Sequence, residues 1–346
     1  MAKKDEKKSL EETIKDLNKK FGANSVMTGN NASSCTQFID TGSIALNEAI
    51  GGGWPLEGKI IDIFGWESSG KSTLTQLAIG NYQKMGLRKA LLIDAENSLS
   101  KTYSSALGLD LDELLLVQLD ASGSEGAYSK MEALVRTGEV GLVVIDSYNA
   151  LKPKSTKTEG SADKSVSDSN IGRHAMMMGN VVDLCNDLCI RYQTTFMFIG
   201  QLRQAVGVMY GSNEIVQGGN ALKFFAHVRA KVSRSTTKDN SVMDGETKLG
   251  NKTSVEIIKN KISSPFKKAS FDILYGLGID KVGELIDLAK ARKVLKIWNG
   301  TITYKEEKYS EEDFRDMLDD NPEFFDEVKS KVVSSESVEQ EVETEV

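Results

Sequence analysis

The residues best suited to chemistry form a glycine-rich segment in the first quarter of the chain. Residues 65–72 read GWESSGKS and match the phosphate-binding pattern G-x-x-x-x-G-K-[ST]. Gly65 and Gly70 would let backbone N–H groups turn toward phosphate oxygens. Lys71 would reach the terminal phosphates, and Ser72 would offer its hydroxyl to Mg²⁺. The apolar run IIDIF precedes this segment and the helical pattern LTQLAI follows it, which is the strand–loop–helix context that the motif requires.

Carboxylates follow two other apolar runs. Asp146 ends the run GLVVID, where it would complete the Mg²⁺ coordination that Ser72 begins. Asp94 and Glu96 follow the run LLI, and Glu96 could activate the water that attacks a phosphate. A carboxylate at the end of a strand can also simply cap the next helix. Beside a phosphate-binding loop, however, these residues favour nucleotide hydrolysis.

An amide lies in a corresponding place after a further apolar run. Gln201 follows FMFIG and precedes a glycine-rich stretch, residues 206–219. A neutral amide there could sense a γ-phosphate and pass its state to that stretch. Taken by itself, the residue is better explained as an ordinary surface amide.

Short apolar runs predict the strands that must position these groups, at residues 60–64, 90–93, 142–145 and 195–199. Helical patterns lie between them, for example at residues 74–85 and 176–189. Strands that alternate with helices indicate βαβ units, so we expect an α/β fold with a mainly parallel central sheet. Met176–Met178, Cys185, Cys189 and His227 are expected to have packing roles in these elements.

Composition excludes several classes of protein. The 346 residues carry a net charge of −7, and no apolar run approaches the ~18 residues of a membrane span. The N-terminal sequence has no apolar stretch of the kind found in secretory signals, and three cysteines cannot form a disulfide framework. We therefore expect a cytoplasmic protein with no membrane partner. Charge is uneven, since residues 223–268 hold 11 basic against 4 acidic side chains and residues 301–346 hold 5 against 16.

The ends of the chain differ from its middle. Residues 9–21 predict a helix with a capping box formed by Ser9 and Glu12, and a polar linker follows. Residues 152–170 are polar and predict a long loop. We expect a small N-terminal helical segment, an ATPase core with two loops, a small α+β C-terminal domain and an acidic disordered tail, at residues 1–34, 35–270, 271–333 and 334–346.

Longer stretches resemble the bacterial-type RecA recombinases, in a bacterial or phage version. The similarity runs in family order over residues 21–330. A phosphate-binding loop is shared by many ATPases, whereas GGNALKF and KNKISSPFK are far more specific. Other matching stretches are TGSIALNEAIGGG, ESSGKST, LLIDAE, VVIDS and FDILYGLGID. The resemblance implies a P-loop NTPase core of the RecA-like type and a DNA-dependent ATPase that acts in recombination, DNA repair and the SOS response to DNA damage.

The resemblance also implies roles at the nucleotide. ATP and Mg²⁺ would be the cofactors, with Glu96 activating water and Gln201 coupling the γ-phosphate to a DNA-binding loop. Lys259 and Lys261 would reach the phosphates of a neighbouring subunit in a helical filament. The residues that would bind the nucleotide are Gly65, Trp66, Glu67, Ser68, Ser69, Gly70, Lys71, Ser72, Thr73, Tyr103 and Asp146, with Ser72 and Asp146 on the metal.

Single-stranded DNA and a homologous duplex are the partners that the resemblance implies. Two DNA-binding loops would correspond to residues 155–171 and 202–216. Lys223 and Phe224 would lie at the interface between subunits, and single-strand-binding and mediator proteins would assist. The residues that would contact DNA are Ile171, Gly172, Arg173, Arg203, Val206, Met209, Tyr210, Gly218, Gly219 and Asn220.

Some positions depart from the family pattern. Trp66 stands where the family usually has proline, and Gly200 stands where it has asparagine. Asn97 and Ser100 alter the run that follows the second strand, and Met176 occupies the place of a DNA-contacting arginine, which Arg173 would replace. The residues for nucleotide chemistry are intact, so an active ATPase is expected.

Three other functions share parts of this pattern. A hexameric DNA helicase would use the same core, but the C-terminal region and KNKISSPFK oppose it. A small-molecule kinase would use the P-loop without responding to DNA. A filament that uses ATP only as an assembly switch would not need Glu96 and Asp146. The leading interpretation is an ATP-dependent recombinase that pairs homologous DNA strands.

Overall fold

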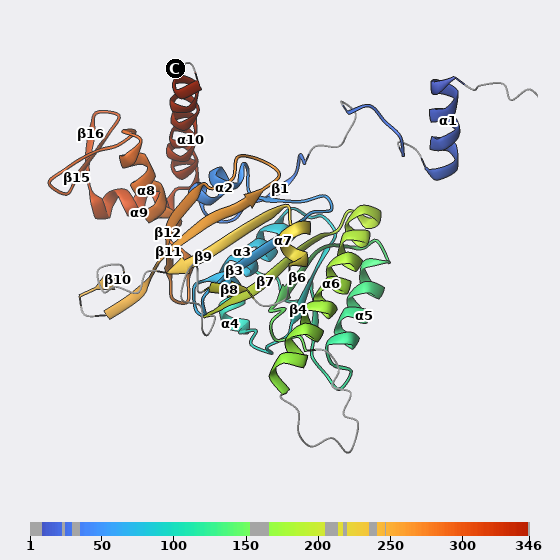
Figure 1. Cartoon of the computed structure of the whole chain (residues 1–346). Helices are drawn as coiled ribbons and strands as arrows, with labels where there is room; N and C mark the ends of the chain where they lie inside the picture. Colours follow the sequence, from blue (N-terminus) through green and yellow to red (C-terminus); the bar gives the residue numbers. More distant parts are fainter. Residues whose placement is uncertain are drawn as a thin grey trace, which may run out of the picture. The chain divides into compact units, whose positions relative to one another are not determined.

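The computed structural model describes residues 9–22, 25–29, 35–152, 166–204, 214–216, 220–234, 241–245 and 247–344 (Figure 1). Residues 1–36 and residues 37–346 form two compact units. No helix in the described ranges combines the length and the apolar character that crossing a bilayer requires.

The first unit contains helix α1, Leu10–Phe21. Ser9 accepts a hydrogen bond from the backbone of Glu12, whose side chain accepts one from the Ser9 backbone, so the predicted capping box is confirmed. Gly22 ends the helix with a φ of 109°. No residue of α1 is buried within this chain.

The second unit is built on one large sheet. Its main path has the strand order β13–β12–β11–β9–β3–β7–β6–β4–β5, in which the strands from β9 to β5 run parallel. This confirms the predicted mainly parallel sheet. The strands in it are β3 Ile60–Gly65, β4 Lys89–Asp94, β5 Leu114–Gln118, β6 Val140–Asp146, β7 Thr195–Gln204, β8 Glu214–Val216, β9 Val228–Arg234, β10 Ser241–Asp244, β11 Thr247–Asn260, β12 Lys268–Leu274 and β13 Gly278–Ile279. A separate pair joins β1 Phe38–Ile39 to β2 Trp54–Pro55.

Helices cover both faces of this sheet (Figure 1). On one face, Ile61 and Ile63 of β3 pack in a core with α3; on the other, Ile60 packs with α5 and α6. Strand residues therefore alternate between two apolar cores, as parallel strands covered on both faces require. The helices of this part are α2 Ile44–Ile50, α3 Lys71–Lys84, α4 Lys101–Ala106, α5 Gly123–Val135, α6 Val166–Tyr192 and α7 Ala221–Phe225.

Most of the side chains expected to have packing roles are buried or partly buried. Cys185 and Cys189 are buried on α6, and burial raises the pKa of the Cys189 thiol to about 12. The Nδ1 atom of His227 accepts a hydrogen bond from the backbone N–H of Ile60. Burial, and to a lesser extent the positive charges of nearby lysines, lower the pKa of His227 to about 4. Met178 is buried, whereas Met176 is exposed.

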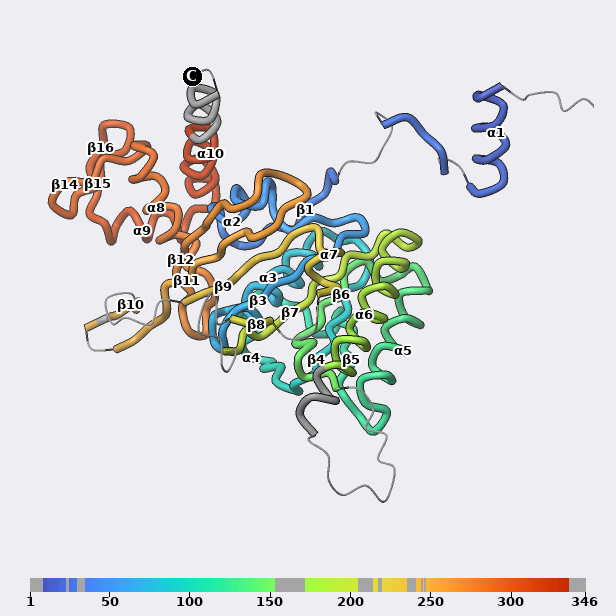
Figure 2. The backbone as a smooth tube through the Cα atoms, in the orientation of Figure 1, coloured from blue at the N-terminus to red at the C-terminus, as the bar shows by residue number. Residues whose placement is uncertain are grey.

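The C-terminal region adds a small α+β layer. It consists of α8 Lys281–Ala291, β14 Lys296–Trp298, β15 Thr301–Tyr304, β16 Glu307–Ser310, α9 Glu311–Asp320 and α10 Pro322–Thr344. A third apolar core, which includes Leu285, Ile302 and Phe314, holds these elements together. Figure 2 traces the backbone from the main sheet into this layer.

The secondary structure runs across two predicted boundaries. The division after residue 270 falls inside β12, which pairs with β11 and β13, so the main sheet continues to Ile279. The acidic tail was expected to be disordered from Ser334, but α10 continues to Thr344. Glutamate is a good helix former, so its enrichment there does not break the helix that Pro322 begins.

Buried polar contacts fix the C-terminal layer to the core. The carboxylate of Glu284 on α8 accepts hydrogen bonds from the Ser43 hydroxyl at 2.5 Å and from the backbone N–H groups of Ile44 and Ala45 at 3.1 Å each. It thereby satisfies the free N–H groups at the start of α2. Arg292 forms a bidentate pair with Glu48 at 2.6 and 2.9 Å.

Replacing Glu284 should weaken the fold more than replacing an exposed carboxylate. In Glu284→Ala three buried donors lose their acceptor, which should lower the free energy of unfolding by about 3 kcal/mol. Glu113→Ala removes only the exposed pair with Lys89 and should cost less than about 1 kcal/mol. Urea unfolding of both variants tests this, and equal losses would contradict it.

Candidate functional site

The phosphate-binding loop, residues 65–72, joins β3 to α3 near the middle of the sheet. A Cβ atom on Gly65 would lie 2.0 Å from the carbonyl oxygen of Val232. Gly70 has a φ of +97°, and a Cβ there would lie 2.5 Å from the side chain of Ile273. Close approach of the Val232 backbone therefore requires glycine at position 65, and the positive φ favours it at position 70, in agreement with the motif.

Lys71 is only 6% exposed, and its Nζ donates a hydrogen bond to the carbonyl oxygen of Trp66 at 2.7 Å. Burial lowers the pKa of its ammonium group, although the carboxylates of Asp146, Glu96 and Glu67 oppose the shift. The Ser69 hydroxyl is buried and has no hydrogen-bond partner among the described residues. A buried cation and an unpaired hydroxyl at the start of a helix fit an anionic phosphate.

Acidic groups meet at the ends of two neighbouring strands. Asp94 on β4 is the register partner of Asp146 on β6. The pKa of Asp146 is raised to about 6, chiefly by burial and in part by the negative charges of Glu96 and Asp94, although a hydrogen bond from Ser72 opposes the shift. A cation would relieve this cost, and the Ser72 hydroxyl and Asp146 carboxylate are oxygen ligands that suit Mg²⁺. The described residues contain no cluster of three metal-binding side chains, so most ligands would come from phosphate and water.

Glu96 and Gln201 are in direct contact. The Glu96 Oε1 atom accepts hydrogen bonds from the Ser147 hydroxyl at 2.6 Å and from the Gln201 side-chain amide at 3.1 Å. The backbone N–H of Gln201 donates to the Asn149 side-chain oxygen at 2.7 Å. The structure therefore brings two predicted residues together and adds Ser147 and Asn149. Sequence reasoning missed both, although they are the first and third residues after Asp146.

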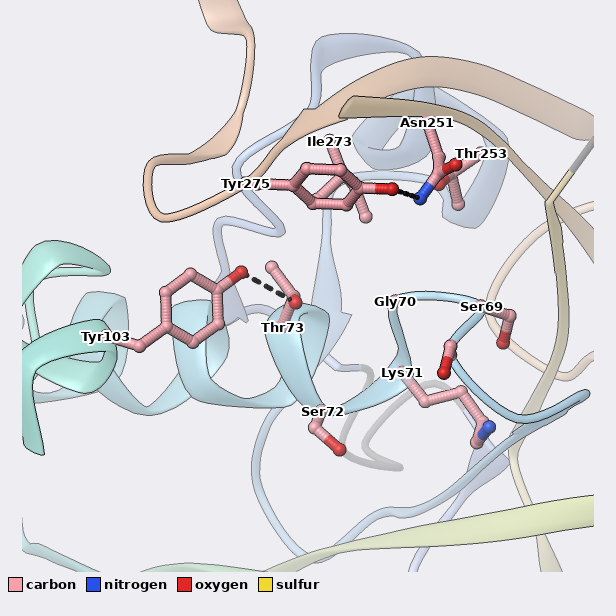
Figure 3. Close-up of a pocket in the computed structure, with 11 residues that line it drawn as sticks. Ser69, Gly70, Lys71, Ser72, Thr73, Tyr103, Asn251, Thr253, Ile273 and Tyr275 are labelled. Atoms are coloured by element: carbon pink, nitrogen blue, oxygen red, sulfur yellow. Dashed lines mark hydrogen bonds between the residues drawn. The ribbon is translucent and has the colours of Figure 1, made fainter. Parts of the chain in front are cut away.

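A cavity of about 220 Å³ lies over the loop (Figure 3). The Tyr103 hydroxyl shares a hydrogen bond of 2.9 Å with Thr73, and the Tyr275 hydroxyl accepts one of 2.8 Å from Asn251. Sequence reasoning missed four lining residues, Asn251, Thr253, Ile273 and Tyr275. They come from or directly follow the antiparallel strands β11 and β12, and the one available signal was the tyrosine of the family stretch FDILYGLGID. Two tyrosines beside a phosphate-binding loop suit a planar base.

Trp66 connects the loop to a strand that sequence analysis did not predict. Its indole N–H donates to the Glu214 carboxylate at 3.1 Å, and Lys231 pairs with the same carboxylate. The contact with Lys231 is the main reason why the pKa of Glu214 lies below its usual value. Glu214 belongs to β8, which pairs with the end of β7.

This strand pair corrects the second predicted DNA loop. Of residues 202–216, the first three continue β7 and the last three form β8, because their backbones pair in antiparallel register. The first predicted loop, residues 155–171, is also wrong at its end, since α6 begins at Val166. Residues 153–165 and 205–213 lie outside the described part of the chain.

The predicted DNA-contacting residues fall into two groups. Gly172 and Arg173 are exposed on α6, Arg203 is exposed on β7, and Asn220 is exposed at the start of α7. The backbone of Ile171 is in α6. The others, Val206, Met209, Tyr210, Gly218 and Gly219, lie outside the described residues.

The predicted catalytic lysines do not lie at this site within one chain. Lys259 on β11 pairs with Arg229, which pairs with Asp62 of β3, and the backbone N–H of Lys261 bonds to His227. They lie toward the start of β3, whereas the phosphate-binding loop follows its end, roughly 10 Å further along the strand.

The lysines instead border an exposed apolar side chain. The Lys259 Nζ donates to the carbonyl oxygens of Lys223 and Phe224 at 2.8 Å each, and burial lowers its pKa, assisted by Lys261 and Arg229. Phe224 is 73% exposed. We call Lys223, Phe224, Lys259 and Lys261 the α7 cluster.

Comparisons with known proteins agree with this geometry. The family model "RecA N-terminal domain" matches residues 8–280. Three proteins named "Protein RecA" are similar over nearly the whole chain: 39% identical in Streptomyces venezuelae, over 96% of this chain and 85% of that protein; 40% in Clavibacter michiganensis subsp. michiganensis, over 95% and 88%; and 39% in Phytoplasma mali, over 94% of each.

The raised pKa of Asp146 should appear in the pH dependence of stability. Its folded-state pKa of about 6 exceeds the ordinary value of 3.8, so the folded chain holds more protons between these values. The free energy of unfolding should therefore fall as pH rises from about 4 to about 6. This fall should be about 2 kcal/mol larger in wild type than in Asp146→Asn. Urea unfolding of nucleotide-free protein with a chelator measures this, and identical pH profiles would contradict it.

Proposed function

Because the chain belongs to the RecA family and is thus an ATP-binding, DNA-dependent recombinase, we propose how its own residues hydrolyse ATP and pair DNA strands. The observation that carries the proposal is the hydrogen bond between Glu96 and Gln201. It joins a carboxylate beside the phosphate-binding loop to the strand that leads toward the second predicted DNA loop.

The nucleotide is assigned to the cavity over the loop. Lys71 holds the terminal phosphates, and Tyr103 and Tyr275 hold the base. Mg²⁺, held by Ser72 and Asp146, would neutralise charge on the phosphates. The Glu96 carboxylate orients the attacking water and takes its proton, and Ser147 fixes its direction.

The α7 cluster is assigned to the neighbouring subunit of a helical filament. Its lysines are too far from the phosphate-binding loop of their own chain, and the exposed ring of Phe224 offers apolar contact area. In a stacked subunit, Lys259 and Lys261 would stabilise the charge that develops on the transferred phosphoryl group, as an arginine finger does. Hydrolysis would then depend on assembly.

DNA binding is assigned to the two predicted loops and the residues beside them. Arg173 and Arg203 supply exposed charges for phosphates. Apolar side chains of the second loop, Met209 and Tyr210 among them, would lie between bases of a spread single strand. Base pairing with a homologous duplex would then read the sequence. We further propose that the protein acts in the cytoplasm, with single-strand-binding and mediator proteins.

Joint-molecule formation tests the proposal. The assay contains labelled single-stranded DNA, a homologous supercoiled duplex, ATP and Mg²⁺, with a heterologous duplex as control. We expect products that need both ATP and homology. Lys71→Ala should abolish them, because the terminal phosphates lose their cation. DNA-stimulated hydrolysis without joint molecules would instead favour a helicase.

Subunit mixing tests the assignment in trans. Glu96→Gln and Lys259→Ala should each lose nearly all DNA-stimulated ATPase activity. In an equal mixture, about a quarter of the interfaces would combine an intact Glu96 with an intact Lys259, so about a quarter of the activity should return. No recovery in filaments that contain both variants would contradict the assignment.

A further inference from the structure

The turn that follows β6 contacts both residues assigned to water activation and phosphate sensing. The turn comprises Ser147, Tyr148 and Asn149. Its first residue donates to Glu96, and its third accepts from the backbone N–H of Gln201. The backbone N–H of Tyr148 donates to the carbonyl oxygen of Ile199, which ties the turn to β7 at a third point.

The ring of Tyr148 explains why position 200 is glycine. Tyr148 is 1% exposed, and a Cβ atom on Gly200 would lie 2.2 Å from its hydroxyl oxygen and 2.6 Å from its Cζ. Even alanine would therefore force this buried ring to shift. The resemblance in sequence expects asparagine at position 200, so this chain lacks an amide next to Gln201 on its own strand.

Asn149 supplies an amide from the neighbouring strand end. Its side-chain oxygen lies 2.7 Å from the Gln201 nitrogen, and its Nδ2 atom is buried without a partner among the described residues. The N–H of Gln201 fixes which end of the amide faces β7, because only the oxygen can accept that bond. Without Asn149, that N–H would lose its acceptor.

We propose that Asn149 is a positioning residue for ATP hydrolysis, which takes over the role of an amide at position 200. It holds the Gln201 backbone so that the side chain reaches Glu96. The inference rests on the proposed roles of Glu96 and Gln201 in DNA-stimulated hydrolysis. Tyr148, Asn149 and Gly200 then act as one set. The tyrosine ring occupies the space of a side chain at position 200, and Asn149 supplies the amide that position 200 lacks.

Two substitutions of similar size separate the hydrogen bond from packing. Asn149→Leu keeps the volume and removes the acceptor, whereas Asn149→Asp keeps an acceptor oxygen. We expect Asn149→Leu to lower kcat for ATP in the presence of single-stranded DNA about tenfold, with the KM for ATP changed less than about twofold. Asn149→Asp should stay within about threefold of wild type. The control Asn180→Ala, at an exposed position of α6, should leave both constants unchanged.

A rescue tests the set as a whole. Tyr148→Val, Asn149→Ala and Gly200→Asn together open the space at 200 and place an amide there. This triple variant should regain most of the DNA-stimulated kcat that Tyr148→Val with Asn149→Ala has lost. Nucleotide binding measured without DNA should be the same in all folded variants. A general loss of structure would weaken nucleotide binding as well, so this measurement distinguishes the two causes.

The outcomes separate this inference from the proposed function. A wild-type chain whose hydrolysis ignores DNA would overturn both. A stimulated wild type together with an equally stimulated Asn149→Leu would overturn the inference alone. So would a variant that loses kcat and nucleotide affinity in equal measure, or a triple variant without recovery. If Asn149→Leu does not fold, the triple variant and Asn149→Asp decide the question.

Discussion

The parallel register of four strands is the constraint on which the rest of the structure depends. Because β3, β7, β6 and β4 run in the same direction, their ends meet at one edge of the sheet. In this register Gly65 lies beside Gln201 and Asp94 beside Asp146. Backbone pairing thus brings together the phosphate-binding loop, the carboxylate proposed to bind metal and the amide proposed to sense phosphate.

The phosphate-binding loop and the neighbouring strand end hold charged groups whose burial disfavours their charged forms. Burial lowers the pKa of Lys71 and raises that of Asp146. In both groups the neutral form is therefore favoured more than it would be in water. A phosphate group and a divalent cation would offset both of these desolvation costs. The fold holds the two charged groups in place, so they need no rearrangement to meet such ligands.

Contacts lead from this site toward the predicted DNA-binding segments along two routes. One passes from Glu96 through Gln201 into β7, and the other from Trp66 through Glu214 into β8. Both strands flank the second predicted DNA loop, and they pair with each other. A change at the phosphates could therefore reach both ends of that loop, whereas the α7 cluster lies toward the start of β3 and is proposed to face a partner subunit.

The sequence by itself determined the features that are local. Motif spacing and short-range periodicity predicted the P-loop, its flanking strand and helix, the capped N-terminal helix and the strand-end carboxylates Glu96 and Asp146. The role predicted for Gln201 came only from the family resemblance. Tertiary structure alone decided which of these meet. The cavity wall of Asn251, Thr253, Ile273 and Tyr275 depends on antiparallel strands β11 and β12, which are remote in sequence from the P-loop. Long-range contacts also decided three other features: the continuation of the sheet beyond residue 270, the β7–β8 pair and the contact of Asn149 with Gln201. They depend on strand pairing and on packing between distant segments, which no local sequence pattern encodes.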